Sequence, residues 1–486
     1  MTLDDTIAAI ATPLGEGGLA VVRLAGPRAL EIADRSFRPA GKRWLKPSAA
    51  ATHTIQYGHI VRHGQSVDEV LLAVLRAPHT FTREDTVEIT CHGGLLPAKL
   101  VLDTLLESGA RAADPGEFTR RAFLNGRLDL AQAEAVADLI HSRTELALAA
   151  ANEQLAGKLS QRINRLRDEM MLTLAHVEAH IDFPDEDIAP DTKEQLLGRL
   201  ARGVAFMEEL LRTANEGQIL RRGIRAAIVG RPNAGKSSLL NQLLGHDRAI
   251  VSPVPGTTRD TIEETANIRG LPVVFIDTAG LREARDEIEQ EGVRRSRASL
   301  ARAEFILQVL DASESLTAAD EKYLAEFAGK KRILVVNKID LPRKLQLPDE
   351  VGLAVPGEPR PNKVGARGPR SRADGSASRP YLNCVDVCCL SGQGIEALKD
   401  AIKELVWSGE ITAGMLQVMI NSRHQDALNR ARAATQRTLE VLRGGETLEL
   451  AAGELRIAVN AIGEIVGKTT TEDLLDSVFS QFCIGK

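Results

Sequence analysis

The run from Gly230 to Ser237, GRPNAGKS, has the residue types and spacing of a phosphate-binding loop. Its glycines let backbone N–H groups converge on anionic oxygens, and the start of a helix adds a favourable dipole. Lys236 is expected to reach the β- and γ-phosphates, and the Ser237 hydroxyl to hold Mg²⁺. A glycine turn without a ligand would fit the same letters, but an apolar run before the loop and a helical pattern after it favour nucleotide binding.

Two later tetrapeptides complete such a site, and each follows an apolar run expected to be a strand. In DTAG (277–280) the carboxylate can bind Mg²⁺ through water, and Gly280 can turn its N–H toward the γ-phosphate. In NKID (337–340), Asp340 can accept hydrogen bonds from the N1–H and the 2-amino group of guanine, a pair that adenine does not offer. Lys338 is expected to lie along the plane of the base. The three motifs in this order predict GTP as the nucleotide.

The residue types give less guidance about hydrolysis. Leu281 follows DTAG, and an apolar side chain cannot orient the attacking water as a glutamine would. The loop 252–260, SPVPGTTRD, offers Thr257 and Thr258 as hydroxyl ligands for Mg²⁺ and the γ-phosphate. Asn233, inside the phosphate loop, has an amide oxygen suited to a monovalent cation. From the residues alone, the group that orients water stays open.

These motifs need a sheet to hold them, because each follows a strand. Between residues 219 and 410, expected strands alternate with helical patterns and lie at 224–229, 273–278, 305–311 and 333–338. Alternation of this kind predicts a doubly wound, mostly parallel sheet, that is, a P-loop GTPase or G domain. Within it, residues 356–380 are rich in Pro, Gly, Ser and basic residues. They are expected to be a surface insertion, with a basic RNA-contacting arm as the alternative.

The rest of the chain has two further sequence patterns. Residues 1–118 mix short β-rich runs with glycine turns and predict an α+β domain. Residues 119–218 and 411–486 have helical apolar spacing and few Gly or Pro, so we expect them to form one helical domain in two parts. The G domain, 219–410, would be inserted between those parts. The predicted fold class is therefore multidomain α/β.

Composition narrows the class of protein. The chain has 486 residues, a net charge of −5 and 3% aromatic residues, which argues against a basic nucleic-acid field and extended base stacking. Five irregularly spaced cysteines do not form a disulfide framework and indicate a reducing compartment. The first residues carry acids where a signal peptide would be basic, and no apolar stretch is long enough for a bilayer. We expect a cytoplasmic protein with no membrane partner.

Several other patterns have a plainer interpretation. His176 and His180 lie one helical turn apart, like zinc ligands, but without a third ligand a solvated helix face is favoured. His92-Gly93-Gly94 resembles an esterase oxyanion loop, yet the chain has no GxSxG nucleophile, so a tight turn is favoured. Four arginines of the N-terminal part are expected to be surface charges rather than RNA contacts; these are Arg28, Arg111, Arg120 and Arg121.

A set of longer motifs resembles the family of tRNA modification GTPases known as MnmE or TrmE, within the TrmE-Era-EngA-like P-loop GTPases. The motifs span nearly the whole chain and are DTIAAIATPLGEGGLAVVRLAG, PGEFTRRAFLNGRLDLAQAEAVADLI, HIDFPDEDI, GRPNAGKSSLLN, PGTTRD, DTAGLRE, NKID and the terminal CIGK. One departure lies in the loop beside the base. It reads Cys388-Cys389-Leu390-Ser391-Gly392, where the family usually has a Ser-Ala pair before the glycine turn.

The resemblance implies a potassium-activated GTPase whose G domains associate during hydrolysis. K⁺ would be held by Asn233, Ser252, Val254 and Thr257, and Mg²⁺ by Ser237 and Thr258. Glu289 would position the attacking water and so fill the gap left by Leu281. The expected GTP-binding residues are Asn233, Ala234, Gly235, Lys236, Ser237, Ser238, Ser252, Thr257, Thr258, Asp277, Thr278, Ala279, Gly280, Asn337, Lys338 and Asp340.

For the N-terminal domain the resemblance implies constitutive homodimerisation and binding of 5-formyl-tetrahydrofolate or a related one-carbon folate. The matching positions are Arg23, Glu88, Arg127 and Lys486, with Arg127 standing where relatives often have Lys. Cys483 in the terminal CIGK is the second expected catalytic residue, beside Glu289.

The implied reaction uses the FAD-dependent partner MnmG (GidA), in a heterotetramer or larger complex, to place an aminomethyl or carboxymethylaminomethyl group on C5 of the wobble uridine of certain tRNAs. The alternative is a regulatory switch GTPase, for example in ribosome assembly, without base chemistry. The GTP motifs fit both functions, whereas the folate positions and the CIGK tail favour base modification.

Overall fold

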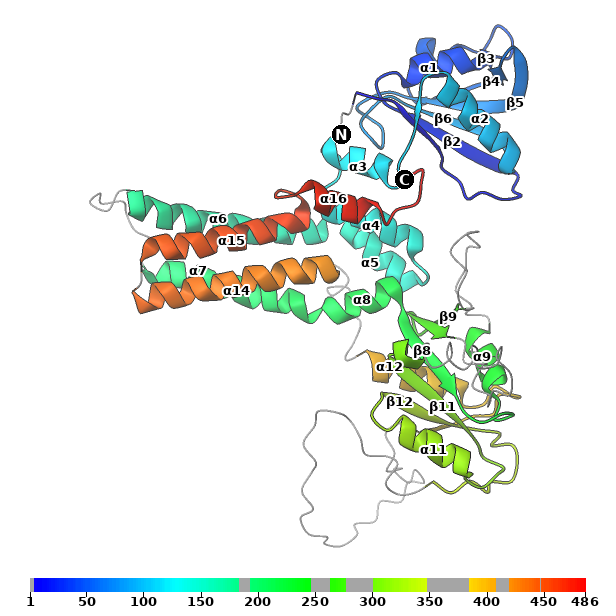
Figure 1. Ribbon diagram of the computed structural model, residues 1–486, viewed down its shortest axis with the longest axis vertical. Helices are drawn as coiled ribbons and strands as arrows, with labels where there is room; N and C mark the ends of the chain where they lie inside the picture. Colours follow the sequence, from blue (N-terminus) through cyan, green and yellow to red (C-terminus); the bar gives the residue numbers. More distant parts are fainter. Residues whose placement is uncertain are drawn as a thin grey trace, which may run out of the picture.

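The computed structural model describes residues 4–182, 193–245, 263–276, 300–347, 384–407, 419–445 and 447–486. Figure 1 shows three bodies: an α+β domain that contains the N-terminus, a long helical bundle, and an α/β domain connected to the bundle through α8. The predicted multidomain α/β class is confirmed. The predicted domain limits at 118, 218 and 410 stay predictions, since residues 408–418 lie outside the described part.

The N-terminal domain is a seven-stranded sheet covered by two helices. Its strands are β1 (Ile7–Ile10), β2 (Leu19–Ala25), β3 (Phe37–Pro39), β4 (Thr54–Arg62), β5 (Gln65–Leu75), β6 (Thr86–His92) and β7 (Arg111–Ala112), in the order β3-β4-β5-β6-β2-β1-β7. Its helices are α1 (Ala29–Ser36), α2 (Leu95–Glu107) and the short 3-10 turn η1 (Pro47–Ala49). Along β2, Val22 and Leu24 are buried in the core, so alternation places Arg23 on the opposite face.

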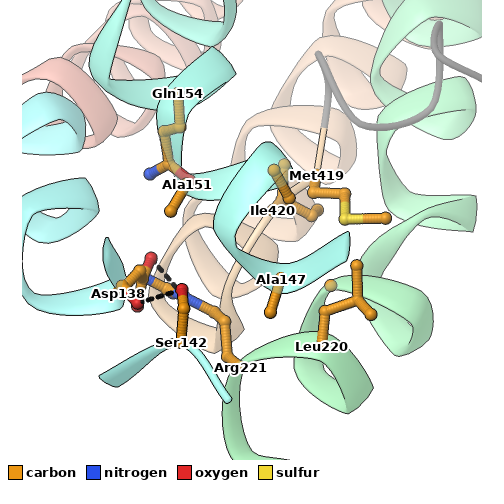
Figure 2. Close-up of a pocket in the computed structure, with 11 residues that line it drawn as sticks. Asp138, Ser142, Ala147, Ala151, Gln154, Leu220, Arg221, Met419 and Ile420 are labelled. Carbon is orange, nitrogen blue, oxygen red and sulfur yellow. Dashed lines mark hydrogen bonds and ion pairs between the residues drawn. The ribbon is translucent and has the colours of Figure 1, made fainter. Parts of the chain in front are cut away.

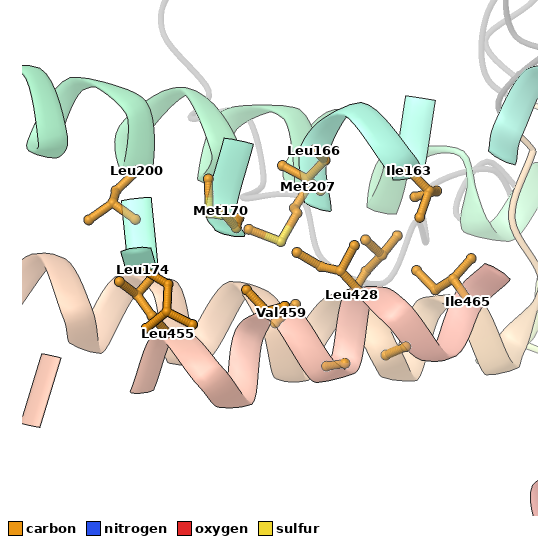
Figure 3. Packing of buried hydrophobic residues seen from close by; sticks show 14 of the residues in the cluster. Ile163, Leu166, Met170, Leu174, Leu200, Met207, Leu428, Leu455, Val459 and Ile465 are labelled. Carbon is orange, nitrogen blue, oxygen red and sulfur yellow. The ribbon is translucent and has the colours of Figure 1, made fainter. Parts of the chain in front are cut away.

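The helical domain is built from two separated stretches of the chain. The first contains α3 (Glu117–Leu124), α4 (Leu130–His141), α5 (Glu145–Leu155), α6 (Lys158–Asp182), α7 (Lys193–Arg212) and α8 (Ala214–Arg222), and the second α14 (Ser422–Gly444), α15 (Leu448–Val466) and α16 (Glu472–Phe479). Positive φ values at Gly126 and Gly157 accompany two breaks in the first stretch. The long helices α6, α7, α14 and α15 pack side by side around a shared apolar core (Figure 3).

The chain leaves and re-joins this bundle at one place. Gly217 on α8 lies so close to the residue that leads into α14 that an added Cβ would be 2.4 Å from the Ile420 carbonyl oxygen. Only glycine fits such an approach. The α/β domain between these two positions is therefore an insertion in the helical domain, as the helical patterns on both sides of it predicted.

A buried ionic network joins α4 to the start of α14. Arg423 donates to both carboxylate oxygens of Glu134 at 2.8 Å and to the carbonyl oxygens of Glu464 and Ile465. His424 Nε2 lies 2.8 Å from Glu134, and its backbone N–H is capped by the side chain of Asn421. Burial, which the Glu134 charge only partly offsets, lowers the pKa of His424 to about 4. His424 is therefore neutral near pH 7.

This histidine makes stability depend on pH. Its pKa is about 4 in the folded chain and near 6.5 when exposed, so between these values the unfolded chain binds more protons. We expect the free energy of unfolding of the helical domain to fall as pH is lowered, by about 1.5 kcal/mol between pH 6.5 and pH 5. Urea midpoints followed by circular dichroism would measure this. The loss should shrink in His424→Gln, and equal losses in variant and parent would contradict the assignment.

The inserted domain has a six-stranded sheet in the order β13-β12-β11-β8-β10-β9. Its described strands are β8 (Ile224–Val229), β9 (Glu263–Ile268), β10 (Leu271–Ile276), β11 (Phe305–Asp311), β12 (Arg332–Asn337) and β13 (Cys384–Asp386), and its helices α9 (Lys236–Leu244), α11 (Ala318–Glu326) and α12 (Ile395–Val406). All neighbouring strands are parallel except β9, which forms an antiparallel hairpin with β10. The predicted doubly wound sheet is thus present, with an edge hairpin that alternation alone did not reveal.

Among the described helices, none is long and apolar enough to cross a bilayer.

Candidate active site

The phosphate-binding loop runs from the end of β8 to the start of α9. Gly230 and Gly235 have φ values of +150° and +98°, and Asn233 between them has +64°, so the loop turns through conformations that favour glycine and asparagine. Lys236 begins α9, and its Nζ donates to the carbonyl oxygens of Gly230 and Arg231 at 2.8 and 2.9 Å. This lysine therefore lies folded across the loop in which the phosphates are expected.

Asn337 joins this loop to the region that is expected to contact the base. Its Nδ2 donates to the carbonyl oxygen of Ala234 at 2.9 Å, and its Oδ1 accepts from the backbone N–H of Cys389 at 3.1 Å. The side chain is buried, and a Cβ on Gly235 would lie 2.1 Å from its Nδ2. One amide thus holds three segments in register: the phosphate loop, the end of β12, and the Cys388–Gly392 loop.

The two charged residues of NKID are held by separate partners. Lys338 has a positive φ of 65°, and its Nζ is 2.6 Å from Asp311 Oδ2 at the end of β11. Burial opposes ionisation of Asp311, but hydrogen bonds from Lys338 and Ser313 outweigh it and lower the pKa of that carboxyl. Asp340 is exposed, and its Oδ1 accepts from the Cys388 thiol at 3.2 Å. Asp340 can therefore present its carboxylate to a base.

Cys388 stands where the family usually has serine, and its contact with Asp340 gives a prediction. Cys388→Ser keeps a donor for Asp340, so we expect GTP affinity within about twofold of the parent; Cys388→Val removes the donor and should weaken affinity roughly fivefold, about 1 kcal/mol. Fluorescence titration with a labelled GTP analogue would measure both. If the serine and valine variants lose affinity equally, the thiol is not a donor to Asp340.

The structure gathers only part of the predicted GTP site. It brings together Asn233, Ala234, Gly235, Lys236, Ser237, Ser238, Asn337, Lys338 and Asp340 around the carboxyl ends of β8 and β12. The remaining predicted residues lie outside the described part of the chain; they are Ser252, Val254, Thr257, Thr258, Asp277, Thr278, Ala279, Gly280 and Glu289. Ser237 and Asn233 are exposed oxygen donors of the kind that Mg²⁺ and K⁺ accept, so this half of the site fits both cations.

A second cluster lies where the C-terminal tail meets the N-terminal sheet. Arg23 on β2 donates from Nε to Glu88 on β6 at 2.9 Å, and from Nη1 to the carbonyl oxygen of Gly485 at 3.3 Å. Its guanidinium also lies over the Phe118 ring, 5.6 Å from the centroid. The backbone N–H of Phe118 donates to the carbonyl oxygen of Lys486 at 3.1 Å. The structure therefore unites three of the four predicted folate positions, Arg23, Glu88 and Lys486.

The fourth folate position, Arg127, lies beside another aromatic ring. Its guanidinium is 5.9 Å from the centre of the Phe81 ring, and Phe81 packs against the cluster that contains Phe118. Burial and the neighbouring Arg23 charge lower the pKa of Lys486. Cys483 is exposed on the same tail. Positive side chains around aromatic rings suit an aromatic ligand that bears carboxylates, as a folate does.

The prediction of surface arginines was wrong for Arg121. Its side chain is 1% exposed and pairs with Asp5, Glu84 and the buried Glu117. Arg111 bonds the same glutamate at 2.6 Å. This network ties α3 to the N-terminal sheet and so fixes Phe118 beside Arg23. Sequence reasoning missed it because its members come from four separate segments, although the Glu117–Arg121 spacing of one helical turn was a signal.

The phosphate-binding loop and the parallel sheet define the class of protein: a P-loop GTPase domain inserted in a helical bundle, together with an N-terminal α+β domain. Among the described residues, no cluster of three or more His, Cys, Asp or Glu has the arrangement of a metal site.

Comparisons with known proteins narrow this class. The model of the MnmE helical domain matches residues 130–483, and the model of the GTP-binding protein TrmE N-terminus matches residues 6–127. The tRNA modification GTPase MnmE of Geobacillus kaustophilus (strain HTA426) is 48% identical over 490 residues, which covers 100% of both chains. That of Bacillus subtilis (strain 168) is 45% identical over 486 residues, 99% of this chain and 100% of the relative.

Among solved structures, the crystal structure of Era in complex with MgGDPNP and nucleotides of 16S ribosomal RNA is similar, with 26% sequence identity and a TM-score of 0.26. The match covers 43% of this chain and 66% of the Era chain. The family models and the full-length relatives agree. The chain belongs to the MnmE family of tRNA modification GTPases.

Proposed function

We propose that this protein is a potassium-activated GTPase that acts with the FAD-dependent protein MnmG to install the C5 aminomethyl or carboxymethylaminomethyl group on the wobble uridine of certain tRNAs. The observation that carries the proposal is the docking of the CIGK tail against Arg23, which also pairs with Glu88. A GTPase that acts only as a switch has no need of this second site. The names of the full-length relatives support tRNA as the substrate.

In the nucleotide site each side chain has a distinct task. Lys236 would bind the β- and γ-phosphates, and Asp340 would select guanine through two hydrogen bonds. Asn337 keeps both regions at a fixed separation through its two hydrogen bonds. Positive charge at the phosphates would be supplied by Mg²⁺, held by Ser237 and Thr258, and by K⁺, held by Asn233, Ser252, Val254 and Thr257.

Hydrolysis would require a group to orient water, and Glu289 is our candidate. Its carboxylate can accept a hydrogen bond from the attacking water, which Leu281 cannot do. Association of the G domains of two protomers would accompany GTP turnover, with the N-terminal domains holding the homodimer together. Binding of MnmG in a heterotetramer or larger complex would then place the tRNA base near the second site.

At that second site the chain's own residues would bind a one-carbon folate. Arg23, Arg127 and Lys486 can pair with its carboxylates, and Glu88 can accept from ring N–H groups. Its one-carbon unit would supply the carbon added to the base. Cys483, exposed on the docked tail, is the proposed catalytic thiol.

Two measurements on the full-length protein test the proposal. GTP turnover at equal ionic strength should be several-fold faster in KCl than in NaCl, and equal rates would overturn the potassium mechanism. Titration with 5-formyl-tetrahydrofolate should saturate, and Arg23→Ala should weaken binding while Arg35→Ala should not. Arg35 is an exposed arginine of the same domain, paired with Glu31. Absence of saturable binding would favour a switch GTPase.

A further inference from the structure

The segment between α4 and α5 lies against the edge hairpin of the G domain. Arg143, in that segment, donates from Nη1 to the Thr265 hydroxyl on β9 at 2.5 Å. Beside it, Leu146 faces Gly270 in the β9–β10 turn, where an added Cβ would lie 3.6 Å from the leucine side chain. One corner of the helical domain thus contacts both a strand and a turn of the hairpin.

The burial of Thr265 shows that this contact is more than a surface encounter. Ala266 and Ile268 belong to the core between the sheet and α9 and α12, so alternation along β9 places Thr265 on the opposite face. Thr265 is nevertheless 0% exposed. A buried hydroxyl needs a partner, and Arg143 of the helical domain donates to it.

The same corner is fixed firmly to the helical domain. Arg221, near the end of α8, donates from Nε to Asp138 on α4 at 2.6 Å, an ion pair drawn in Figure 2. Apolar residues from both domains then fill the junction; they are Ala147, Ala150, Leu220, Leu271, Trp407 and Met419. Arg143 therefore extends from a rigid support.

Thr265 also has a significant position along the chain. It lies seven residues after Thr258, the proposed Mg²⁺ ligand. Within the described sheet, β9 pairs only with β10. As an edge strand, β9 has strand pairing on one side alone, and the packing of Ala266 and Ile268 supports it from within the G domain. A contact at Thr265 fixes β9 from outside the G domain.

We infer that Arg143 is a positioning residue for GTP hydrolysis. By bonding Thr265 it holds β9, the strand that follows the proposed Thr257–Thr258 pair, in the position that hydrolysis requires. The inference rests on the proposed roles of those threonines. Orientation of the helical domain is thereby coupled to the GTPase site without any contact between Arg143 and the nucleotide.

The test compares variants of the full-length protein in steady-state GTP hydrolysis. We expect Arg143→Ala and Thr265→Val each to lower kcat roughly three- to tenfold with KM within about twofold, because Lys236, Asn337 and Asp340 are untouched. The double variant should be no slower than either single one, and Thr265→Ser should restore the rate. Arg456→Ala is the matched control, since Arg456 pairs with Glu178 of the same domain at the surface of the bundle.

Hydrogen exchange gives a second readout that does not depend on activity. Amides of residues 263–268 should exchange faster in Arg143→Ala and Thr265→Val, but not in Arg456→Ala. The inference is overturned if both variants behave like the control, or if their effects on kcat multiply in the double variant. Thr258→Ala tests the proposed Mg²⁺ ligand separately from Arg143. If this variant keeps full GTPase activity, the proposed role of Thr258 fails, whatever the outcome at Arg143.

Discussion

Asp340→Asn is expected to weaken GTP binding by about 100- to 1,000-fold and to create binding of xanthosine triphosphate. The carboxylate is expected to accept from both N1–H and the 2-amino group of guanine, whereas an asparagine amide would replace one acceptor with a donor. That donor opposes the 2-amino group of guanine but matches the 2-oxo group of xanthine. Equilibrium titration with labelled nucleotides would measure both affinities.

Asp400→Asn is the matched control for this variant. Asp400 is an exposed carboxylate on α12 that pairs with Arg269, so its change should leave both affinities as in the parent. The rest of the site should stay intact in Asp340→Asn, because Asn337 keeps its bonds to Ala234 and Cys389. Unchanged GTP affinity, or weakened GTP binding without any gain for the xanthine nucleotide, would show that Asp340 does not read the base.

Glu134→Gln is expected to destabilise the helical domain by about 3–5 kcal/mol, because it leaves the charge of Arg423 without its buried partner. Burial alone would raise the pKa of Glu134, yet the charge of Arg423 and the hydrogen bonds from Arg423 and the neutral His424 hold it well below its usual range. The carboxylate is therefore ionised and compensates Arg423. Urea denaturation followed at 222 nm, with hydrogen exchange on α14, would report the loss.

The control for this loss is Glu178→Gln, which breaks the pair with Arg456 at the surface of the same domain. An exposed ion pair of this kind contributes about 0–1 kcal/mol. A clear gap between the two variants is therefore the predicted result. Comparable stability in both would mean that the buried network contributes little to holding α4 against α14.

The parts of the fold that sequence predicted are those whose signal is local. The phosphate loop and NKID are each an unbroken run of residues directly after an apolar strand. Their placement at the carboxyl ends of the strands could therefore be predicted from the sequence. The long apolar stripes of the bundle are equally local. The antiparallel strand β9 was missed because a two-residue turn within a parallel pattern has little signature of its own.

What sequence could not predict depends on residues far apart in the chain. Arg143 and Thr265 are separated by 122 positions, and Arg23 and Gly485 by 462. Nothing in either neighbourhood indicates its partner. Burial of Arg121 likewise depends on a carboxylate at Asp5. Such contacts follow from the packing of domains, which a single sequence read by pattern does not specify.

Modification of a tRNA base by this GTPase is tested most directly by mass spectrometry of tRNA nucleosides. Nucleosides from cells that lack the gene should have lost the C5 aminomethyl-type wobble uridines. The parent gene should restore them, and a Cys483→Ser variant should not. An unchanged nucleoside profile in the deletion strain would contradict the account and leave a GTPase whose product is a conformational state.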